Sequence, residues 1–284
     1  MPTFSNQATL SYNGLTTTSN VVTGELVDVL SASKETLNNT YTAGQNLPYI
    51  ITLVNTGNTD LTGLTVTDNL GSFPFGAQTL VPLTYVPNSV RYYVNGVLQP
   101  APVPTSVSPL TVSGIRVPAG GNTVIAYEAE VNSFAPQGTG ETILNTATVT
   151  GAGVNTPVTA STTAVSADTP VLTINKGVSP ATVTENGQLT YTFTIENSGS
   201  TEAGAGANVV ISDTFNPILN PITVTLDGVP LTAGTDYTYD TATGAFATTA
   251  GRVTVPVAAY SRNAVTGTLD TAPGSTVLVV SGTV

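Results

Sequence analysis

The stretch Tyr49-Ile50-Ile51-Thr52-Leu53-Val54, followed by Asn55-Thr56-Gly57-Asn58, is typical of the whole chain. Its first part is rich in β-branched and aromatic residues, which favour strands, and its second part consists of residues that favour tight turns. Similar short apolar runs, each ended by Gly, Pro, Asn or Asp, recur along the 284 residues. This pattern predicts an all-β protein built from sandwiches.

The composition excludes several classes of function. Charged residues make up only 8% of the chain, with 6 Lys and Arg against 17 Asp and Glu, so the net charge is −11. Six basic residues are too few to neutralise the phosphates of nucleic acid or an anionic membrane. The chain has no His and no Cys, which removes the usual nucleophile pairs, metal ligands and disulfides. We therefore expect no cofactor, no metal, no nucleic-acid or membrane partner, and no enzyme.

The sequence contains one module twice. The run Leu47 to Gly57 resembles Leu189 to Gly199, and Leu64 to Asp68 resembles Val209 to Asp213. Internal repeats of this kind indicate repeated structural units. We expect two immunoglobulin-like β-sandwich modules in tandem behind an N-terminal arm that carries a donor strand. The expected boundaries are 1–25 for the arm, 26–165 for the first module and 166–284 for the second.

The two modules are expected to differ at their ends. The first continues past Val131 to a further strand, Ile143 to Val149, whereas the second has no such strand, because Val284 aligns with Val131. A sandwich that lacks one strand exposes unpaired backbone groups and an apolar groove. We therefore expect the second module to be incomplete by itself.

The missing strand has a counterpart at the other end of the chain. Phe4 to Leu10 matches Ile143 to Val149 in character, position for position, although it precedes the first module. The simplest interpretation is that the N-terminal strand of one subunit completes the second module of another by strand addition. Head-to-tail pairing of this kind makes an open filament unless it closes into a ring. The expected partner is therefore a homopolymer, and such filaments can also bundle laterally.

Polar residues occur on the core-facing phase of the predicted strands. The two lysines of the chain, Lys34 and Lys176, stand at the same place in the two modules. Asp68 and Asp213, and Asn145 and Asn6, share the same inward phase. Burial shifts such groups towards neutrality, and a neutral amine beside a protonated carboxylic acid can attack an Asn carboxamide, which releases ammonia.

Plainer interpretations of these residues remain open. Each lysine fits a side chain that reaches the surface, each aspartate a turn residue, and each asparagine a hydrogen-bonded sheet residue. Glu128 and Glu130 are rival acids in the first module, but the aligned stretch Val279 to Thr283 contains no acid. A mechanism shared by both modules therefore favours Asp68.

The segment Leu64 to Leu70, with Val-Thr-Asp-x-Leu, and the Asn-x-Ala-x-Val strand from Asn145 resemble a large bacterial surface repeat family of unknown function. Its immunoglobulin-like modules can carry intramolecular isopeptides, and they occur in appendage proteins of endospores. The second copy departs from this pattern, with Phe215 for the leucine and no terminal Asn strand. For the first copy, the resemblance implies a bond between Lys34 and Asn145, with Asp68 as catalyst.

Carried to the second copy, the resemblance implies Lys176 and Asp213, with Asn6 of another subunit as acceptor. The expected function is a structural subunit of a self-assembling extracellular fibre on the spore surface, locked by isopeptide bonds. The alternative is a surface adhesin or ligand-binding spacer without covalent polymerisation. The N-terminus carries no pattern of a signal peptide, so release on lysis of a sporulating mother cell is the expected route.

Overall fold

The chain is all-β in the computed structural model, which describes residues 3–25 and 28–284. Within these ranges the one helical element is a short 3₁₀ turn, η1 (Ala205–Ala207). No helix in the described ranges is long and apolar enough to cross a membrane. The predicted all-β class is confirmed, and its cause is the alternation of β-branched residues with turn residues along the chain.

The chain divides into two compact units. The first takes in the described residues of Met1–Asn39, Gly44–Asn132 and Ile143–Ala164, and the second takes in Thr40–Ala43, Ser133–Thr142 and Val165–Val284. The predicted boundary lay between residues 165 and 166. The division in the structure falls between Ala164 and Val165, and it adds two short earlier segments to the second unit.

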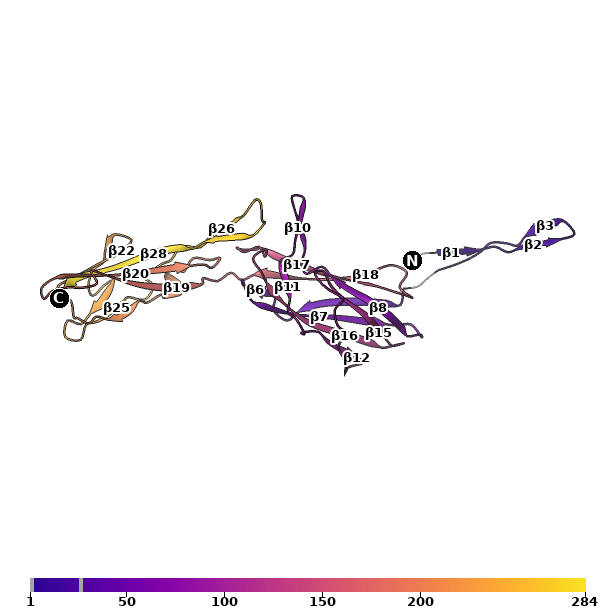
Figure 1. Ribbon diagram of the computed structural model, residues 1–284, viewed down its shortest axis with the longest axis horizontal. Helices are drawn as coiled ribbons and strands as arrows, with labels where there is room; N and C mark the ends of the chain where they lie inside the picture. Colours follow the sequence, from indigo (N-terminus) through magenta and orange to yellow (C-terminus); the bar gives the residue numbers. More distant parts are fainter. Residues whose placement is uncertain (1–2, 26–27) are drawn as a thin grey trace. The chain divides into compact units, whose positions relative to one another are not determined.

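Residues Thr3 to Glu25 form one long β-hairpin, which we call the N-terminal hairpin (Figure 1). Its strands are β1 (Thr3–Asn6), β2 (Thr9–Tyr12), β3 (Leu15–Thr18) and β4 (Val22–Glu25). β1 pairs with β4 and β2 with β3, and no other described strand pairs with them. The turn is Asn13-Gly14, with φ of 47° and 77°, the positive values that a two-residue hairpin turn requires. The predicted single strand Phe4 to Leu10 is therefore half of a hairpin.

The first unit is a sandwich of two sheets. One sheet has the order β13-β12-β16-β7-β5, with β11 also on β16, and the other has the order β14-β15-β8-β17-β18-β6. The two residues of β6 and the last two of β18, which pair with each other, belong to the second unit in the division given above. The bounds are β5 (Leu30–Thr36), β6 (Thr40–Tyr41), β7 (Asn46–Asn55), β8 (Leu61–Asp68), β9 (Phe73–Phe75), β10 (Gln78–Leu80), β11 (Leu83–Tyr85), β12 (Arg91–Val94), β13 (Val97–Gln99), β14 (Ser106–Val107), β15 (Leu110–Val117), β16 (Asn122–Val131), β17 (Thr142–Thr150) and β18 (Val158–Ser166). β9 and β10 form a separate hairpin.

The second unit repeats part of this arrangement. Its larger sheet has the order β19-β20-β28-β22-β23, its smaller sheet has the order β21-β25-β24, and β26 and β27 form a hairpin. The bounds are β19 (Leu172–Ser179), β20 (Gln188–Asn197), β21 (Ser212–Thr214), β22 (Ile222–Leu226), β23 (Val229–Pro230), β24 (Tyr237–Tyr239), β25 (Ala245–Thr248), β26 (Ala259–Arg262), β27 (Leu269–Ala272) and β28 (Gly274–Thr283).

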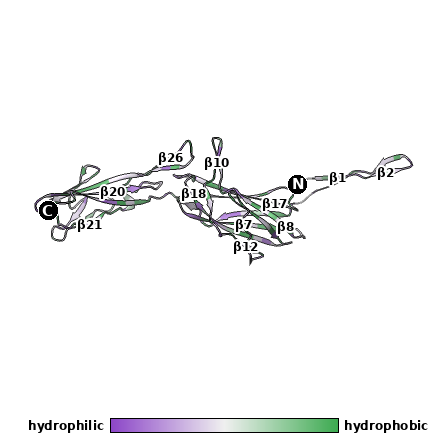
Figure 2. Ribbon diagram, viewed as in Figure 1, coloured by the Kyte–Doolittle hydropathy of each residue, from purple (hydrophilic) through white to green (hydrophobic). Residues whose placement is uncertain are grey.

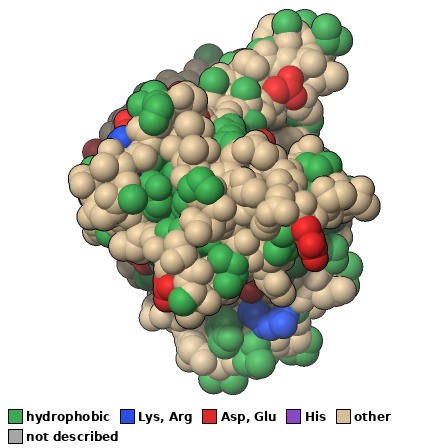
Figure 3. Space-filling view, turned by 90° about the vertical axis from the view of Figure 1, so that its left-hand side faces the viewer, with side chains coloured by type: hydrophobic (Ala, Val, Ile, Leu, Met, Phe, Trp, Pro, Cys, Tyr) green, Lys and Arg blue, Asp and Glu red, His purple; other side chains and the backbone are tan. Residues whose placement is uncertain are grey.

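Alternating burial along the strands builds each core. Every second residue of β7 is buried, and the same holds for β20 and β28, as expected for sheets with one face inward. Hydrophobic residues lie mainly on the strands of the two units (Figure 2). On the face drawn in Figure 3, uncharged side chains and backbone dominate, and charged groups are few. A surface of hydroxyl and amide groups follows from the low content of charged residues.

The two units share a strand register. Lys34 lies opposite Ile51 in the pair β5·β7, and Lys176 lies opposite Phe193 in the pair β19·β20. Leu47 lies opposite Ala129, and Leu189 lies opposite Gly282. Counting on from these pairs places Val284 at the position of Val131, as the sequence alignment predicts.

The smaller sheet of the second unit stops where that of the first unit continues. In the first unit β8 lies between β15 and β17, and β18 follows β17. In the second unit β21 pairs with β25, and no described strand pairs with its other edge. The positions of both β17 and β18 are thus without a counterpart among the described strands, so the edge of β21 presents unpaired backbone groups.

Candidate functional site

A buried ion pair lies in the core of the first unit. Lys34 on β5 and Asp68 at the end of β8 come from opposite sheets, and Lys34 Nζ lies 2.5 Å from Asp68 Oδ2. Their side chains are 0% and 1% exposed. Lys34 Nζ also lies 5.1 Å from the centroid of the Tyr49 ring. The inward phase predicted for both residues is therefore correct.

Two further side chains extend this pair into a hydrogen-bonded chain. The Tyr127 hydroxyl donates to Asp68 Oδ2 at 2.5 Å, and Asn145 Nδ2 donates to the Tyr127 oxygen at 3.0 Å. Tyr127 is on β16 and Asn145 is on β17, where Asn145 is completely buried. The structure thus brings together the three predicted residues, Lys34, Asp68 and Asn145, with Tyr127 between the acid and the amide.

Backbone donors fix the remaining oxygens. Leu70 N–H donates to Asp68 Oδ1 at 2.9 Å, and Gly71 N–H donates to Asn145 Oδ1 at 3.2 Å. Both donors lie in the turn after β8, where φ is 53° at Leu70 and 71° at Gly71. A Cβ at Gly71 would lie 2.5 Å from Ile143 Cγ2, so only glycine fits there. A backbone N–H on the amide oxygen polarises the carbonyl and stabilises negative charge that develops on it.

Burial changes the acid–base properties of this cluster. It lowers the pKa of Lys34 to about 8, against an ordinary 10.5, although the Asp68 carboxylate partly opposes the shift. At pH 7 about a tenth of such amines are neutral and nucleophilic. Burial also raises the pKa of Tyr127 far above its ordinary value, and the Asp68 carboxylate adds to that shift. Tyr127 therefore stays protonated and donates to Asp68.

The second unit holds the same pair in an open setting. Lys176 on β19 bonds to Asp213 on β21, but their side chains are 43% and 19% exposed. The Lys176 ammonium lies 4.6 Å from the Tyr191 ring centroid and 5.8 Å from that of Phe215. Lys176 thus lies on the core-facing side of β19, in the predicted phase, but no described strand covers it. The physical reason is the vacant strand position beside β21.

The whole of β19 is exposed for the same reason. All eight of its residues are exposed, including Leu172 at 38%, Ile174 at 59% and Val178 at 50%. The matching strand β5 is buried at Leu30, Lys34 and Thr36. An apolar face of this kind normally lies against another sheet layer.

The other predicted residues are placed as follows. Asn6 is exposed at the end of β1, where it pairs with Val22, and so does not meet Lys176 within the described chain. Glu128 and Glu130 are exposed on β16, so neither rival acid shares the core with Lys34. Across the described residues, no group of three or more acidic side chains is arranged to hold a metal ion.

Sequence reasoning missed Tyr127. Tyr127 lies on the inward face of its strand together with Ile125 and Ala129, as an ordinary core residue does. The second unit has Val280 at the matching position. The pairs Tyr49 with Tyr127 and Tyr191 with Val280 establish that match. The available signal was weak: Tyr127 faces the same core as Lys34, and a buried tyrosine hydroxyl needs a partner.

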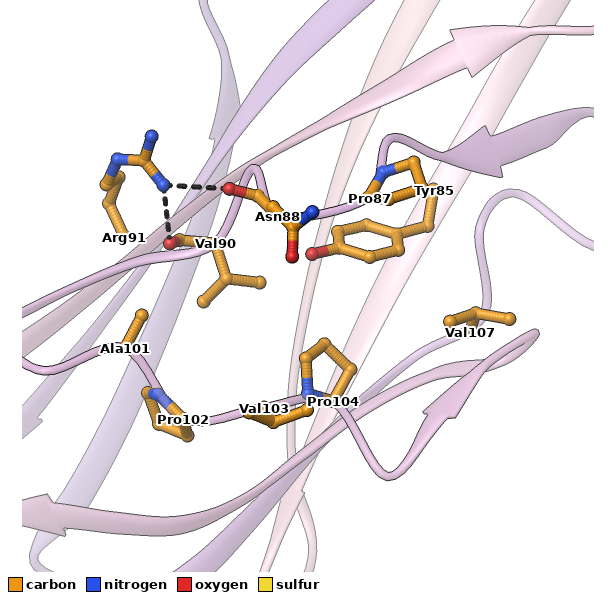
Figure 4. Close-up of a pocket in the computed structure, with 10 residues that line it drawn as sticks. All are labelled: Tyr85, Pro87, Asn88, Val90, Arg91, Ala101, Pro102, Val103, Pro104 and Val107. Carbon is orange, nitrogen blue, oxygen red and sulfur yellow. Dashed lines mark hydrogen bonds between the residues drawn. The ribbon is translucent and has the colours of Figure 1, made fainter.

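A separate open pocket lies on the first unit, with a volume of about 510 Å³. Figure 4 shows its lining of Tyr85, Val90, prolines of the segment 101–104, and Val107. Tyr85 is 6% exposed, and its hydroxyl makes no hydrogen bond with any described residue. Arg91 Nη1, at the rim, is held by the carbonyls of Asn88 and Val90 at 2.9 and 3.0 Å.

Residues 169–271 match the CARDB family. This match lies within the second unit and, together with the sandwich architecture, supports the immunoglobulin-like part of the resemblance found in the sequence. It covers about a third of the chain. Among curated proteins no sequence match is found.

Several solved pilin structures show a distant likeness. The major pilin BcpA of Bacillus cereus is 13% identical, with 95% of this chain and 73% of BcpA covered and a TM-score of 0.36. A fragment of the major pilin GBS80 of Streptococcus agalactiae is 10% identical, with coverages of 55% and 66% and a TM-score of 0.34. The pilus backbone RrgB of Streptococcus pneumoniae is 12% identical, with coverages of 86% and 55% and a TM-score of 0.32. Likeness at this level carries no inference about function.

Proposed function

We propose that the chain is a structural subunit of an extracellular fibre that assembles head to tail by strand donation. One observation carries the proposal. The same lysine–aspartate pair is covered by β17 in the first unit and left open in the second, beside a strand edge with no described neighbour. The segment Phe4 to Leu10 of another copy, with Asn6 in the place of Asn145, supplies the missing cover.

The proposed chemistry is the same at both sites. Lys Nζ attacks Cγ of the Asn carboxamide, so that an Nζ–Cγ bond forms, the Cγ–Nδ2 bond breaks, and ammonia leaves with a proton from the amine. The pairs are Lys34 with Asn145 within a chain, and Lys176 with Asn6 between chains. Asp68 and Asp213 carry protons, and Asp68 has Tyr127 as its link to the leaving nitrogen. No cofactor takes part.

Such bonds suit a fibre that bears load. The bond from Lys34 to Asn145 joins β5 to β17, so that tension between these strands passes through covalent bonds and not only through hydrogen bonds. By analogy with disulfides, closure of a loop of about 100 residues stabilises the folded state by about 4.7 kcal/mol. The bond from Lys176 to Asn6 would turn the filament into one covalent polymer. A position on the spore surface is part of this proposal, and immunogold labelling of intact spores tests it.

The experiment is intact-mass measurement of assembled protein after boiling in detergent. We expect a ladder of multimers, each lighter by one ammonia per bond. Asn6→Ala should abolish the ladder and leave the internal bond in place, whereas Lys34→Ala should leave the ladder and remove the internal bond. Asn20→Ala, in the same hairpin, is the control that should change neither. A ladder that persists in Asn6→Ala would show that the acceptor is another residue.

A surface adhesin remains the second candidate, because the pocket of Figure 4 holds a buried hydroxyl without a described partner. An apolar lining with one convergent polar group is typical of small ligand sites. If Tyr85→Phe or Val103→Arg abolished attachment of the protein to surfaces while the multimer ladder stayed normal, the binding role would be favoured.

A further inference from the structure

Two strand positions, not one, are open in the second unit. In the first unit β17 and β18 follow β8 in the sheet, and both are largely buried on their inner side, with Ile143 at 2%, Ala147 at 0% and Ala164 at 0% exposed. A single donated strand would fill the position of β17 and leave that of β18 empty. The exposure of all eight residues of β19 matches a vacancy two strands wide.

The N-terminal hairpin has the shape of this pair. It contains two antiparallel strands, as β17 and β18 do, and hydrogen bonds continue across the gap between its strand segments. Ser19 N–H donates to Ala8 O at 2.9 Å, and Gln7 Nε2 donates to Ser19 O at 2.8 Å. The hairpin is therefore formed before any docking.

The N-terminal hairpin has no core of its own. Each of its described side chains from Thr3 to Val22 is exposed, including Phe4 at 52%, Leu10 at 60% and Leu15 at 60%. An isolated two-stranded hairpin is marginally stable in water and normally needs a further layer to pack against. The open face of the second unit offers that layer in another copy of the chain.

Between β1 and β4 the cross-strand pairs of the N-terminal hairpin correspond to those of β17 and β18, whereas β2 and β3 pair in a register shifted by one residue. Thr146 Oγ1 and Ser161 Oγ are 2.9 Å apart, so Thr146 lies opposite Ser161. Counting outwards places Ile143 opposite Ala164, and both are buried. With Asn6 in the place of Asn145, Phe4 takes the place of Ile143 and its partner Gly24 takes the place of Ala164. A large residue opposite glycine thus replaces a medium residue opposite alanine.

The Phe4 ring uses the space that Gly24 leaves. A Cβ at residue 24 would lie 2.5 Å from Phe4 Cζ and 2.7 Å from Cε1. The ring therefore lies across the hairpin face and is preset to enter a neighbouring core. Packed cores tolerate exchanges that conserve total volume and resist those that add to it.

We propose that the donor is the entire N-terminal hairpin, which docks as a preformed two-stranded unit on another copy's second unit and adds both missing strands. This inference rests on the proposed function and deepens it. β1 and β2 lie against β21, β3 and β4 take the outer position, and the Phe4–Gly24 pair plugs the core beside Lys176. In the first unit Ala147 pairs with Asp68, and Val149 pairs with Val66. By analogy, we expect Ala8 to pair with Asp213 and Leu10 to pair with Ile211 across the new edge.

A disulfide staple tests whether the hairpin stays closed. Ser5 lies directly opposite Thr23, on the face away from Phe4, and the chain has no cysteine of its own. The full chain with Ser5→Cys and Thr23→Cys is allowed to assemble oxidised and reduced. We expect the same rate and yield of boil-resistant multimers in both states. Assembly that is lost on oxidation and regained on reduction would show that a single strand is donated, and would overturn the inference alone.

Substitutions that change the combined volume of Phe4 and Gly24 test whether this pair fills the core beside Lys176. Gly24→Val should slow multimer formation by about tenfold through overpacking, and Gly24→Ala should slow it less. The double variant Phe4→Ile with Gly24→Ala reproduces the pair Ile143 with Ala164 and should restore the wild-type rate. Equal rates in all four proteins would contradict the docking register. If the wild-type chain itself formed no ladder, the proposed function would fail, which is a different result.

Discussion

Lys34 and Asp68 form an ion pair from which water is excluded, with side chains 0% and 1% exposed, whereas the matching Lys176 and Asp213 are 43% and 19% exposed. The chain therefore carries one chemical device in two environments. Removing either partner of a buried pair destabilises the fold, because the remaining charge has neither a counter-charge nor contact with water. An exposed pair is not, since water replaces the partner.

Asp68→Ala should block the internal bond and destabilise the first unit by about 3–5 kcal/mol, because the covalent link is lost and the unbonded Lys34 amine is buried without a counter-charge. The expected mass is the full sequence mass of the variant, with no ammonia lost. Asp60→Ala is the control, since Asp60 is 40% exposed and pairs with Arg116 at the surface. Urea unfolding and intact mass together test the prediction, and a bond that forms normally without Asp68 would exclude it as catalyst.

The two lysines should differ in reactivity towards an amine-labelling reagent. In the unassembled chain Lys176 should be acylated readily, whereas Lys34 has no access to solvent. In the assembled polymer neither should react, because Lys176 is then covered and bonded. Peptide mapping reads both sites in one experiment, since no other lysine is present. A Lys176 that labels equally well in polymer and monomer would contradict strand donation at this site.

Tyr127→Phe should slow formation of the internal bond by about 10- to 100-fold, because the link between Asp68 and the leaving nitrogen of Asn145 is lost. The bond between chains should form at its normal rate, since Val280 occupies the matching position in the second unit. Tyr85→Phe is the matched control: Tyr85 is also buried in the first unit, its hydroxyl makes no hydrogen bond with a described residue, and it lines the separate pocket of Figure 4. Equal rates for the two variants would remove Tyr127 from the mechanism.

Much of the fold could be predicted from the sequence because the two modules share the same strand register. The lysine phase, the equivalence of Val284 with Val131 and the unmatched edge of β21 all follow from residues that recur at fixed spacing. Asn55, in the run that favours a tight turn, accepts a hydrogen bond from the Gly57 N–H, and its counterpart Asn197 accepts one from the Gly199 N–H. Local patterns of this kind survive because alternation and turn chemistry act over a few residues.

The remaining features depend on contacts between strands that are far apart in the sequence, so the residue pattern of one strand does not predict them. Tyr127 gains its position from β16 and β8 in different sheets, and its spacing is that of any core residue. The hairpin form of the N-terminal segment could have been predicted, because Asn13-Gly14 between alternating runs is a strong hairpin signal. The similarity of Phe4 to Leu10 with a single later strand concealed it. The exposure of Lys176 depends on which strands are absent from the smaller sheet that contains β21, and the sequence around Lys176 does not record that.

The final prediction concerns pH and the free amine of Lys34. Asn145→Ala keeps that amine unbonded, and burial lowers its pKa to about 8 in the folded protein against 10.5 in the unfolded chain. Below pH 8 both states are protonated, and the buried charge opposes folding. Between pH 8 and 10.5 the unfolded chain binds more protons, so the stability of the variant should rise with pH. Burial raises the pKa values of Tyr49 and Tyr127 in the folded protein, whereas tyrosines of the unfolded chain ionise near pH 10, so these two residues oppose the rise at the top of the window in every variant.

The measurement is the urea midpoint of Asn145→Ala across that range, compared with the double variant Lys34→Met with Asn145→Ala. The double variant lacks the titrating amine and should show no rise from this source, and the wild-type chain, whose Lys34 is held in an amide, should resemble it. Because the two variants differ only at residue 34, the difference between their curves isolates this amine. Parallel curves would mean that Lys34 keeps an ordinary pKa in the folded state, and a protonated amine of that kind could not serve as the nucleophile near neutral pH.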